Sequence, residues 1–270
     1  MTTLVMGIVN ATPDSFSDGG RYLATADAVA HGRALTAAGA DILDIGGEST
    51  RPGSQRVSAR VEQERVLPVI EALAAEGAVI SVDTLNASTA AAAIAAGALI
   101  VNDVSGGAAD PEILDAVADT EAHYAIGHWR GPSSDMYARA QYDDVVDEVI
   151  AELGGRHHEA LAAGIPPDRL ILDPGLGFGK RGPQNWAVLR GLERIVAMGP
   201  RVLVGTSRKG FLAEALAEID GEATEPRRDL ATAVTSVRAA QAGAWAVRVH
   251  DVTATRDALH ISRLQTGGPR

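Results

Sequence analysis

The sequence predicts an α/β protein, a single (β/α)8 barrel (TIM barrel), and two observations support this prediction. Short apolar runs alternate with stretches long enough for helices, and a barrel of this kind commonly needs about 250 residues, close to the 270 of this chain. No Gly/Ser-rich or Pro-rich linker divides the chain, so we expect one domain over residues 1–270. A doubly wound open sheet is the alternative that the same alternation allows.

Eight apolar runs are expected to form parallel strands that are buried on both faces. They are Leu4–Val9, Asp41–Ile45, Val79–Asp83, Leu99–Val104, His123–His128, Leu170–Asp173, Arg201–Gly205 and Ala244–His250. The weakly patterned stretches Asp14–Ala24 and Gly46–Ser58 predict long loops after the first two strands. We expect the loops Asn10–Ala24 and Gly46–Ser58 to act as lids that order when a ligand binds.

Several residues mark the expected ends of helices. Glycines followed by an apolar strand close four helical stretches, because glycine tolerates the left-handed conformation that ends a helix. Asn86 and Asp110 are expected to cap the helices that follow them. Pro68 lies inside the second helical stretch and predicts a kink or a late helix start. The four glycines are Gly39, Gly97, Gly164 and Gly243.

The composition excludes several classes of protein. The absence of cysteine excludes disulfides, thiolate nucleophiles and Cys-ligated metal sites. No apolar run approaches the roughly 20 residues of a transmembrane helix, and the N-terminus lacks the pattern of a signal peptide. A net charge of −11 argues against a general nucleic-acid binder, although it allows one small anionic substrate in a locally positive pocket. We therefore expect a cytoplasmic protein that binds neither nucleic acid nor membrane.

Polar side chains end all the predicted strands, and in a barrel these ends meet at one mouth. For any single Asp, Asn or Ser, capping of the next helix is an equally good explanation. Capping does not explain Lys209, Arg248 and His250, which are poor N-caps. The sequence therefore predicts a binding or catalytic site at the mouth.

The expected site combines acceptors with positive charge. Asp83, Asn102 and Asp173 suit a flat heterocycle with adjacent N–H groups, because a carboxylate accepts two parallel hydrogen bonds from such an edge. Positively charged side chains and nearby donors suit phosphate. These donors are Arg51, Lys209, Arg248, His250 and the hydroxyl of Thr50.

Other residues of the mouth have more than one interpretation. Asn10 is a neutral oxygen ligand that, with phosphate oxygens and water, is able to hold Mg²⁺. Asp44 and Glu48 either orient Arg51 or Lys209 or contact a ligand directly. Phe178 either stacks on a ring or packs in the core. The run Gly175–Gly179 looks like a phosphate loop, on weak evidence.

Motifs spread in order over nearly the whole chain carry a family resemblance. They are Met6–Gly20, Asp44–Gly53, Ser81–Thr84, Val101–Gly107, Leu172–Lys180, Ser207–Lys209 and Arg248–Asp251. With these motifs the sequence resembles the dihydropteroate synthases, and its overall look is actinobacterial. The resemblance implies a cytoplasmic, homodimeric, Mg²⁺-dependent transferase of folate biosynthesis. Such an enzyme joins 6-hydroxymethyl-7,8-dihydropterin diphosphate to 4-aminobenzoate, releases pyrophosphate, and is the target of competing sulfonamides.

The resemblance also implies roles for individual residues, with Asn10 as the Mg²⁺ ligand and Lys209, Arg248, His250 and Asn10 as the catalytic set. The implied pterin diphosphate site consists of Thr50, Asp83, Asn102, Asp173, Phe178, Lys209, Arg248, Val249 and His250. The implied aminobenzoate site consists of Phe16, Thr50, Arg51, Pro52, Ser207 and Lys209.

One position departs from the family pattern, and two other functions stay open. Gly127 stands where the family usually has a larger apolar residue, which predicts a wider wall of the pterin pocket. A pterin-binding methyltransferase barrel shares the Asp and Asn pattern but does not need the loop at Asn10–Gly20. An inactive paralogue would be expected to have eroded loops, whereas the loop residues here are intact.

Overall fold

The computed structural model describes residues 2–12, 20–48, 56–132 and 137–265. Eight strands form a closed parallel barrel in which each strand pairs with the next along the chain. The barrel closes because β8 pairs with β1, which confirms the TIM barrel and rules out the open sheet. The strands are β1 (Leu4–Asn10), β2 (Ile42–Gly46), β3 (Ile80–Asp83), β4 (Ile100–Asp103), β5 (His123–Gly127), β6 (Leu170–Asp173), β7 (Arg201–Val204) and β8 (Ala246–Val249).

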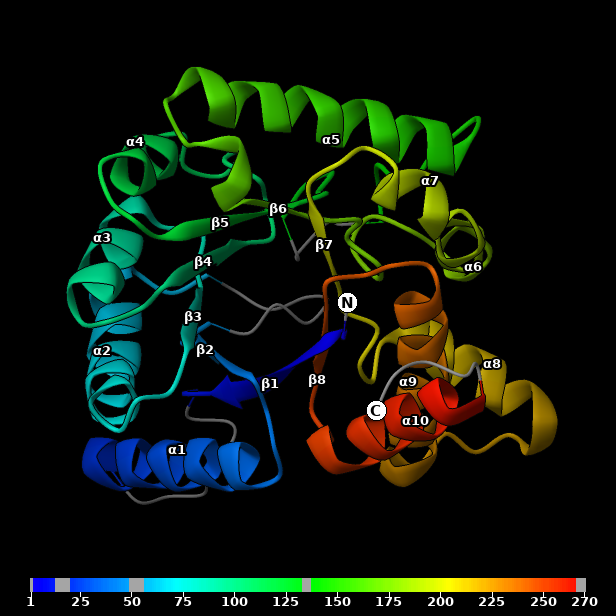
Figure 1. Ribbon diagram of the computed structural model, residues 1–270, viewed down its shortest axis with the longest axis horizontal. Helices are drawn as coiled ribbons and strands as arrows, with labels where there is room; N and C mark the ends of the chain where they lie inside the picture. The colour runs from blue at the N-terminus through cyan, green and yellow to red at the C-terminus, as the bar shows by residue number, and fades with distance from the viewer. Residues whose placement is uncertain (1, 13–19, 49–55, 133–136, 266–270) are drawn as a thin grey trace.

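Helices surround the barrel on all sides in the view of Figure 1. Most connections carry one helix, but β6–β7 and β7–β8 each carry two. The loops that join β1 to α1 and β2 to α2 lie largely outside the described residues. The helices are α1 (Gly20–Ala37), α2 (Ala59–Ala75), α3 (Ala87–Ala95), α4 (Glu112–Ala118), α5 (Val145–Ala162), α6 (Gly182–Arg190), α7 (Leu192–Val196), α8 (Gly210–Asp220), α9 (Glu225–Gln241) and α10 (Val252–Gln265), with a 3-10 turn at Pro167–Arg169.

The helix boundaries agree with the sequence in part. Gly39, Gly97, Gly164 and Gly243 all have positive φ, between 93° and 112°, directly after a helix, as predicted. The capping prediction for Asp110 was wrong: its carboxylate accepts from the amide of Ala87 (2.8 Å) and so caps α3, the neighbouring helix.

Two further boundary predictions were also wrong in their detail. Asn86 occupies the N-cap position of α3 without a capping bond, because its Oδ1 accepts from Arg56 instead (2.8 Å), while its side-chain amide donates to Glu62 on α2 (2.7 Å). The α2 helix begins at Ala59 and continues through Pro68, so of the two outcomes expected there, a kink or a late start, the late start does not occur.

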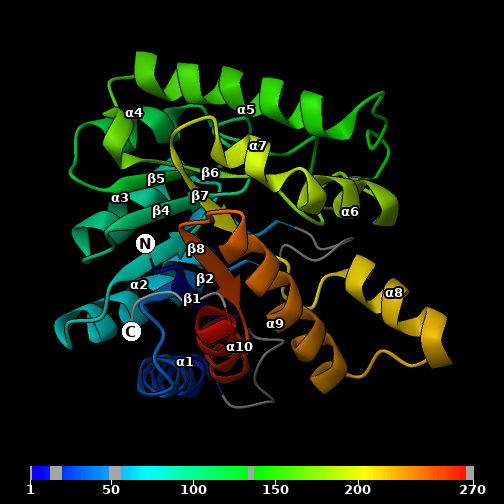
Figure 2. The ribbon, with the colours of Figure 1, turned by 45° about the vertical axis from the view of Figure 1, so that its right-hand side comes forward.

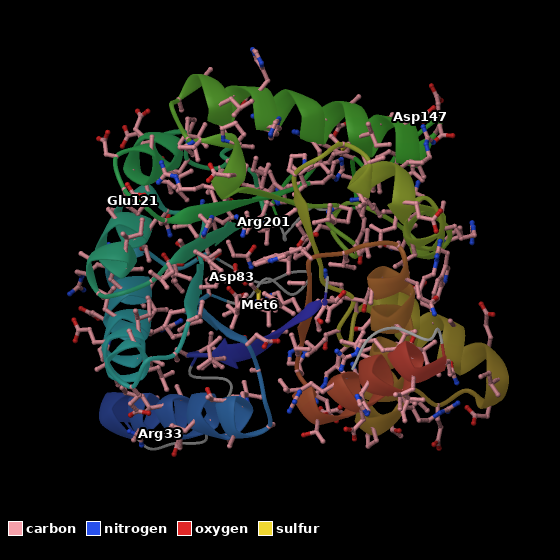
Figure 3. The ribbon with its side chains drawn as sticks, in the orientation of Figure 1. Met6, Arg33, Asp83, Glu121, Asp147 and Arg201 are labelled. Carbon is pink, nitrogen blue, oxygen red and sulfur yellow. The ribbon has the colours of Figure 1, made fainter. Side chains whose placement is uncertain are left out.

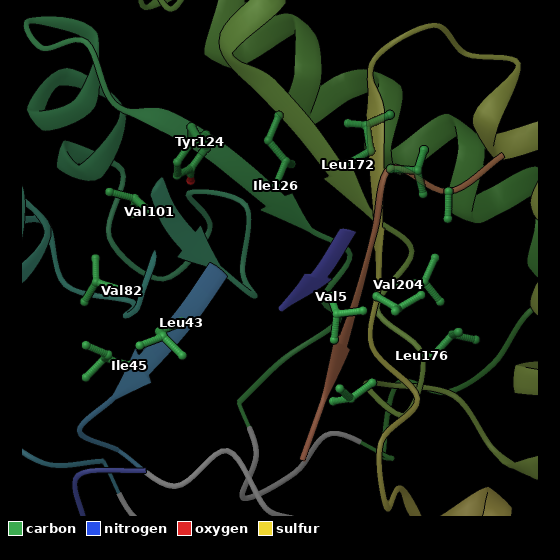
Figure 4. Close-up of a cluster of buried hydrophobic side chains, with 14 of the residues drawn as sticks. Val5, Leu43, Ile45, Val82, Val101, Tyr124, Ile126, Leu172, Leu176 and Val204 are labelled. Atoms are coloured by element: carbon green, nitrogen blue, oxygen red, sulfur yellow. The ribbon is translucent and has the colours of Figure 1, made fainter. Parts of the chain in front are cut away.

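Alternation along each strand separates two cores. Side chains that point outward pack against the helices, among them the residues labelled in Figure 4, such as Val5, Leu43 and Tyr124. Side chains that point inward fill the amino-terminal end of the barrel with an apolar layer. This layer consists of Met6, Ile42, Ile100, Ala125, Ile171, Leu203 and Ala246.

The inward positions change character toward the carboxyl ends of the strands. There the register places Asp44 beside Ser81, Asp83 beside Asn102, and Asp173 beside Gly127. In Figure 3, Met6 and Asp83 both lie toward the centre of the ring, whereas Arg33 and Asp147 lie on its outside. Within the described residues, no helix has the length and apolarity needed to cross a membrane.

Candidate active site

Three buried acceptors lie at the mouth, as the sequence predicts. Asp83 and Asp173 end β3 and β6, Asn102 is the penultimate residue of β4, and all three are at most 9% exposed. Because the strand ends of a closed barrel converge, these side chains come from distant parts of the sequence to one rim. Their carboxylate and amide groups provide an acceptor surface for a polar ring.

Arg248 connects the acids of the mouth from β8. Its Nε donates to Asp44 Oδ2 (2.5 Å) and its Nη2 to Asp83 Oδ2 (2.7 Å). The side-chain amide of Asn102 also donates to Asp44 Oδ2 (3.1 Å). Asp44 is fully buried, and through these hydrogen bonds it orients Arg248 and Asn102. Of the two partners that the sequence suggested, Lys209 does not bond to Asp44 and Arg51 lies outside the described residues.

Two buried carboxylates of the mouth, Asp44 and Asp83, share the guanidinium of Arg248. Burial raises the pKa of Asp83 to about 7; Arg248 opposes this shift, while the neighbouring Asp44 adds to it. Burial also raises the pKa of Asp173, against the opposing effect of Lys209. Asp83 therefore changes its charge near neutral pH.

Lys209 lies on the opposite side of the mouth from β3. Its Nζ donates to the carbonyl of Leu176 and lies 4.4 Å from the ring centroid of Phe178. Burial lowers the pKa of Lys209 to about 8, although Asp173 favours the charged form. Phe178 belongs to a small apolar cluster with Val104, separate from the two barrel cores. Its ring is thus placed at the mouth and not in the main core.

Three amides of the glycine-rich run after β6 already have acceptors inside the protein. The amide of Gly175 donates to Asp173 Oδ1 (2.8 Å), and the amide of Gly177 donates to Asn185 Oδ1 (2.6 Å). The amide of Phe178 donates to the carbonyl of Gly175 (2.9 Å). Because these N–H groups already have partners inside the protein, they are not available to a phosphate.

Lys180 is a residue of the site that sequence reasoning missed. It is 1% exposed, and its Nζ donates to the carbonyls of Gly175 (3.0 Å) and Phe178 (3.2 Å). The same Nζ lies 2.8 Å from His128 Nδ1, and His128 Nε2 lies 2.9 Å from Glu152 on α5. Lys180 therefore fixes the loop that carries Phe178. The available signal was a lysine that closes a glycine-rich run after a strand.

The unusual burial of this cluster changes its protonation. Burial lowers the pKa of Lys180 to about 7, although Asp173 favours its charged form. Burial and the adjacent Lys180 lower the pKa of His128 to about 4. A neutral His128 is thus able to accept from the lysine at Nδ1. These contacts support a structural role for His128.

Ser207 and His250 meet across β7 and β8. Ser207 Oγ lies 2.7 Å from His250 Nδ1 and accepts from the backbone amide of His250 (3.0 Å). Val249, predicted to bind the pterin diphosphate, has its side chain fully buried in the core between barrel and helices. Only the main chain of Val249 is left for such a contact, because successive strand residues point to opposite faces.

The wider pocket expected at Gly127 is not found. A Cβ at this position would lie 2.4 Å from the Cα and the carbonyl oxygen of Val104. The backbone of the loop after β4 therefore fills the space in which the family usually has a side chain. Glycine is needed here for close packing of two backbones.

Some predicted residues cannot be placed or lie apart. Phe16, Thr50, Arg51 and Pro52 lie outside the described residues. Glu48 accepts from the amide of Val57 (3.1 Å) and so holds the chain before α2. Asn10 is exposed at the carboxyl end of β1.

The mouth offers few ligands to a magnesium ion. Among the described residues, no group of three or more His, Asp or Glu side chains is arranged to hold a metal. A single neutral oxygen at Asn10 on a rim with Lys209 and Arg248 fits an ion that a diphosphate brings with it. It does not fit a site made by protein ligands alone.

Comparison with known proteins identifies the family. A family model described as "Pterin binding enzyme" matches residues 6–250. A dihydropteroate synthase of Mycobacterium leprae is 51% identical over 95% of this chain and 91% of its own length. This chain belongs to the dihydropteroate synthase family of pterin-binding enzymes.

Solved structures of the family agree with the fold. The dihydropteroate synthase of Xanthomonas albilineans with 4-aminobenzoic acid superposes with a TM-score of 0.91 at 45% identity, covering 99% of this chain and 94% of that one. The same enzyme in complex with 7,8-dihydropteroate gives a TM-score of 0.86 at 42% identity, covering 99% and 95%. The barrel and its polar mouth are thus those of a dihydropteroate synthase family member.

Proposed function

We propose that this chain condenses 6-hydroxymethyl-7,8-dihydropterin diphosphate with 4-aminobenzoate to give 7,8-dihydropteroate and pyrophosphate. The observation that supports this most strongly is the division of the mouth into two kinds of group. Buried acceptors at Asp83 and Asp173 lie beside the cations Lys209 and Arg248. A neutral ring rich in N–H groups with an anionic tail matches both halves.

The acceptors bind and orient the pterin in this proposal. The carboxylates of Asp83 and Asp173 accept from the N–H groups of the ring, and Asn102 supplies both an amide donor and an oxygen acceptor. Asp44 keeps Asn102 and Arg248 in place from below. Phe178, whose ring is at the mouth, packs against the pterin.

The cations stabilise the departing pyrophosphate. The position expected for the diphosphate lies among Lys209, the remaining N–H donors of Arg248, and His250. No side chain needs to act as a nucleophile, because the pterin ring delocalises the positive charge that develops at its methylene carbon. The amine of 4-aminobenzoate then attacks this carbon, so the transferred group is an alkyl group and catalysis rests on positioning and charge.

A magnesium ion and the aminobenzoate complete the proposed complex. Asn10 would hold Mg²⁺ together with diphosphate oxygens and water, and the ion would supply further neutralisation of the leaving group. Ser207 and Lys209 would bind the aminobenzoate beside the predicted residues Phe16, Thr50, Arg51 and Pro52. Sulfonamides would compete at this position; one solved relative, from Yersinia pestis, is in complex with a sulfonamide drug.

The homodimer is proposed on the surface of three adjacent helices. Figure 2 shows α9 between α8 and α10. These helices carry large apolar side chains that are more than half exposed. A second copy of this chain would cover such a patch. Sedimentation equilibrium at micromolar protein tests this, with a dimer mass expected. The exposed residues are Ile219 (74%), Leu230 (66%), Val234 (62%), Ile261 (53%) and Leu264 (54%).

We also propose that the protein is cytoplasmic. A chain without cysteine is compatible with a reducing compartment.

One assay tests the proposed function. The purified protein is mixed with both substrates and Mg²⁺, and dihydropteroate and pyrophosphate are measured by chromatography. We expect the two products in equal amounts, with both lost on addition of a chelator. Absence of dihydropteroate above a Lys209→Ala control would contradict the proposal, whereas pterin binding without turnover would favour an inactive paralogue.

A further inference from the structure

The turn after β7 contains a strained residue between two residues of the site. Among the described residues, Arg208 is the non-glycine residue with positive φ (55°). The amide of Lys209 donates to the carbonyl of Thr206 (3.2 Å), so Arg208 is the third residue of a four-residue turn. Positive φ at this position favours glycine or asparagine, because the Cβ of other residues crowds the backbone. An arginine must be held in this conformation by other contacts.

Helix α9 supplies these contacts. Arg208 Nε donates to Asp229 Oδ1 (2.6 Å) and Nη2 to Asp229 Oδ2 (2.8 Å), a bidentate pair with a nearly buried carboxylate. Arg208 Nη1 lies 2.9 Å from Glu225, and the backbone amide of Arg208 donates to Thr232 (3.2 Å). Residues 225, 229 and 232 share one face of the helix, so α9 holds Arg208 by its backbone and its side chain.

The two neighbours of Arg208 point the other way. Ser207 meets His250 at the mouth, and Lys209 reaches Leu176 and the ring of Phe178. Arg208 itself makes its contacts with α9 and not with the mouth. The left-handed turn thus directs the side chain of Arg208 to helix α9 and the side chains of Ser207 and Lys209 to the mouth.

We propose that Arg208 is a positioning residue, whose ion pair with Asp229 maintains the left-handed turn that directs Ser207 and Lys209 into the mouth. This inference deepens the proposed function and rests on it for its kinetic test. It assigns Arg208 no contact with substrate. Because φ of Arg208 is strained at 55°, loss of its contact with Asp229 outside the barrel would let the turn relax and move Ser207 and Lys209.

Two substitutions at the same position separate this role from others. Arg208→Ala removes the ion pair and leaves a Cβ at positive φ, so kcat/KM is expected to fall about 100-fold, with the KM for 4-aminobenzoate rising. Arg208→Gly also removes the ion pair, but glycine adopts the turn without strain. It should therefore be about tenfold more active than the alanine variant. Equal losses in both variants, or no loss in alanine, would overturn the proposal.

Asp229 provides a second route to the same answer. Asp229→Asn keeps the volume of the side chain but weakens the pair, and is expected to lower kcat/KM by about fivefold. In the Arg208→Gly background the same substitution should have no further effect, because the turn no longer needs the pair. A full additional loss there would show that Asp229 acts independently of Arg208. The matched control is Arg238→Ala, which breaks an exposed ion pair between α9 and Glu193 and should leave kinetics unchanged.

A measurement without substrate separates this inference from the proposed function. Hydrogen exchange of the Lys209 amide reports whether the turn is formed. We expect faster exchange in Arg208→Ala and exchange close to wild type in Arg208→Gly. An inactive wild-type protein with this exchange pattern would contradict the function alone. An active protein with equal exchange in both variants would contradict the role of Arg208 alone.

Discussion

The two ends of the barrel are made by the same strands with opposite chemistry. At the amino-terminal end the inward side chains are apolar and fully packed, for example Met6, Ile171 and Ala246. Two positions further along the strands, the inward side chains are Asp44, Asp83 and Arg248, with charges removed from water. The apolar layer at the amino-terminal (lower) end stabilises the fold. This stability offsets the cost of burying charged groups at the carboxyl-terminal (upper) end.

The largest expected effect is at the upper end. Asp83→Ala removes a charged acceptor for the pterin ring, so binding of the pterin diphosphate should weaken by at least about 1,000-fold. Stability should be unchanged or higher, because burial already disfavours this carboxylate and Arg248 keeps Asp44 as a partner. Calorimetric titration with the pterin diphosphate checks the first effect, and urea unfolding checks the second. Unchanged affinity would refute the role of Asp83.

The opposite result is expected at the lower end. Ile171→Ala opens a cavity in the fully buried layer and should lower the free energy of unfolding by about 2–5 kcal/mol, whereas Ile171→Val should cost about 0.5–1.5 kcal/mol. Pterin affinity of the folded protein should stay as in the wild type. Urea unfolding and calorimetry again measure both. A pterin affinity that falls with Ile171→Ala would show that the two ends are coupled.

A smaller effect is expected where the upper end meets the loop after β4. Gly127→Ala places a Cβ against the backbone of Val104, which must move because no flexible side chain can yield there. We expect a loss of about 1–3 kcal/mol in stability, together with weaker pterin binding through the displaced Asn102. Gly155→Ala on α5, where a Cβ has open space, is the matched control. Wild-type stability of Gly127→Ala would show that the loop accommodates the methyl group.

The smallest effect is a shift in the pH profile. The pKa values of Asp83, about 7, and Lys209, about 8, predict a narrow bell for kcat/KM of the pterin substrate. Below the first value Asp83 is protonated and loses acceptor capacity; above the second, Lys209 loses its charge. Both changes lower the rate, so the maximum lies between them.

Asp44→Asn tests the origin of the acidic limb. It removes a negative charge beside Asp83 and leaves Arg248 to Asp83 alone, so this limb should move to lower pH, by about one unit or less. The alkaline limb should not move. Asp41→Asn is the matched control at the lower end, where Asp41 accepts from the amide of Val5 (2.8 Å). A shift in that variant, or none in Asp44→Asn, would assign the limb to another group.

Much of the mouth was predictable because its residues occupy strand ends. The alternation of apolar runs and helices located every strand to within a few residues, and barrel closure then placed Asp83, Asn102, Asp173, Lys209 and Arg248 together. Lys180 escaped notice because its burial depends on His128 and Glu152, which come from elsewhere in the chain.

By itself, the sequence determined the alternation of strands and helices, the polar character of one end of the barrel, and the family. These properties depend on local patterns of side chains and on motifs that are contiguous in the chain. Only the tertiary structure decided which groups pair. Arg248 meets Asp44 across 204 residues and Asp83 across 165, Asp110 caps α3 and not its own helix, and the backbone of Val104 fills the space at Gly127. Each of these outcomes depends on distances between strands and helices that exist only once the barrel has closed.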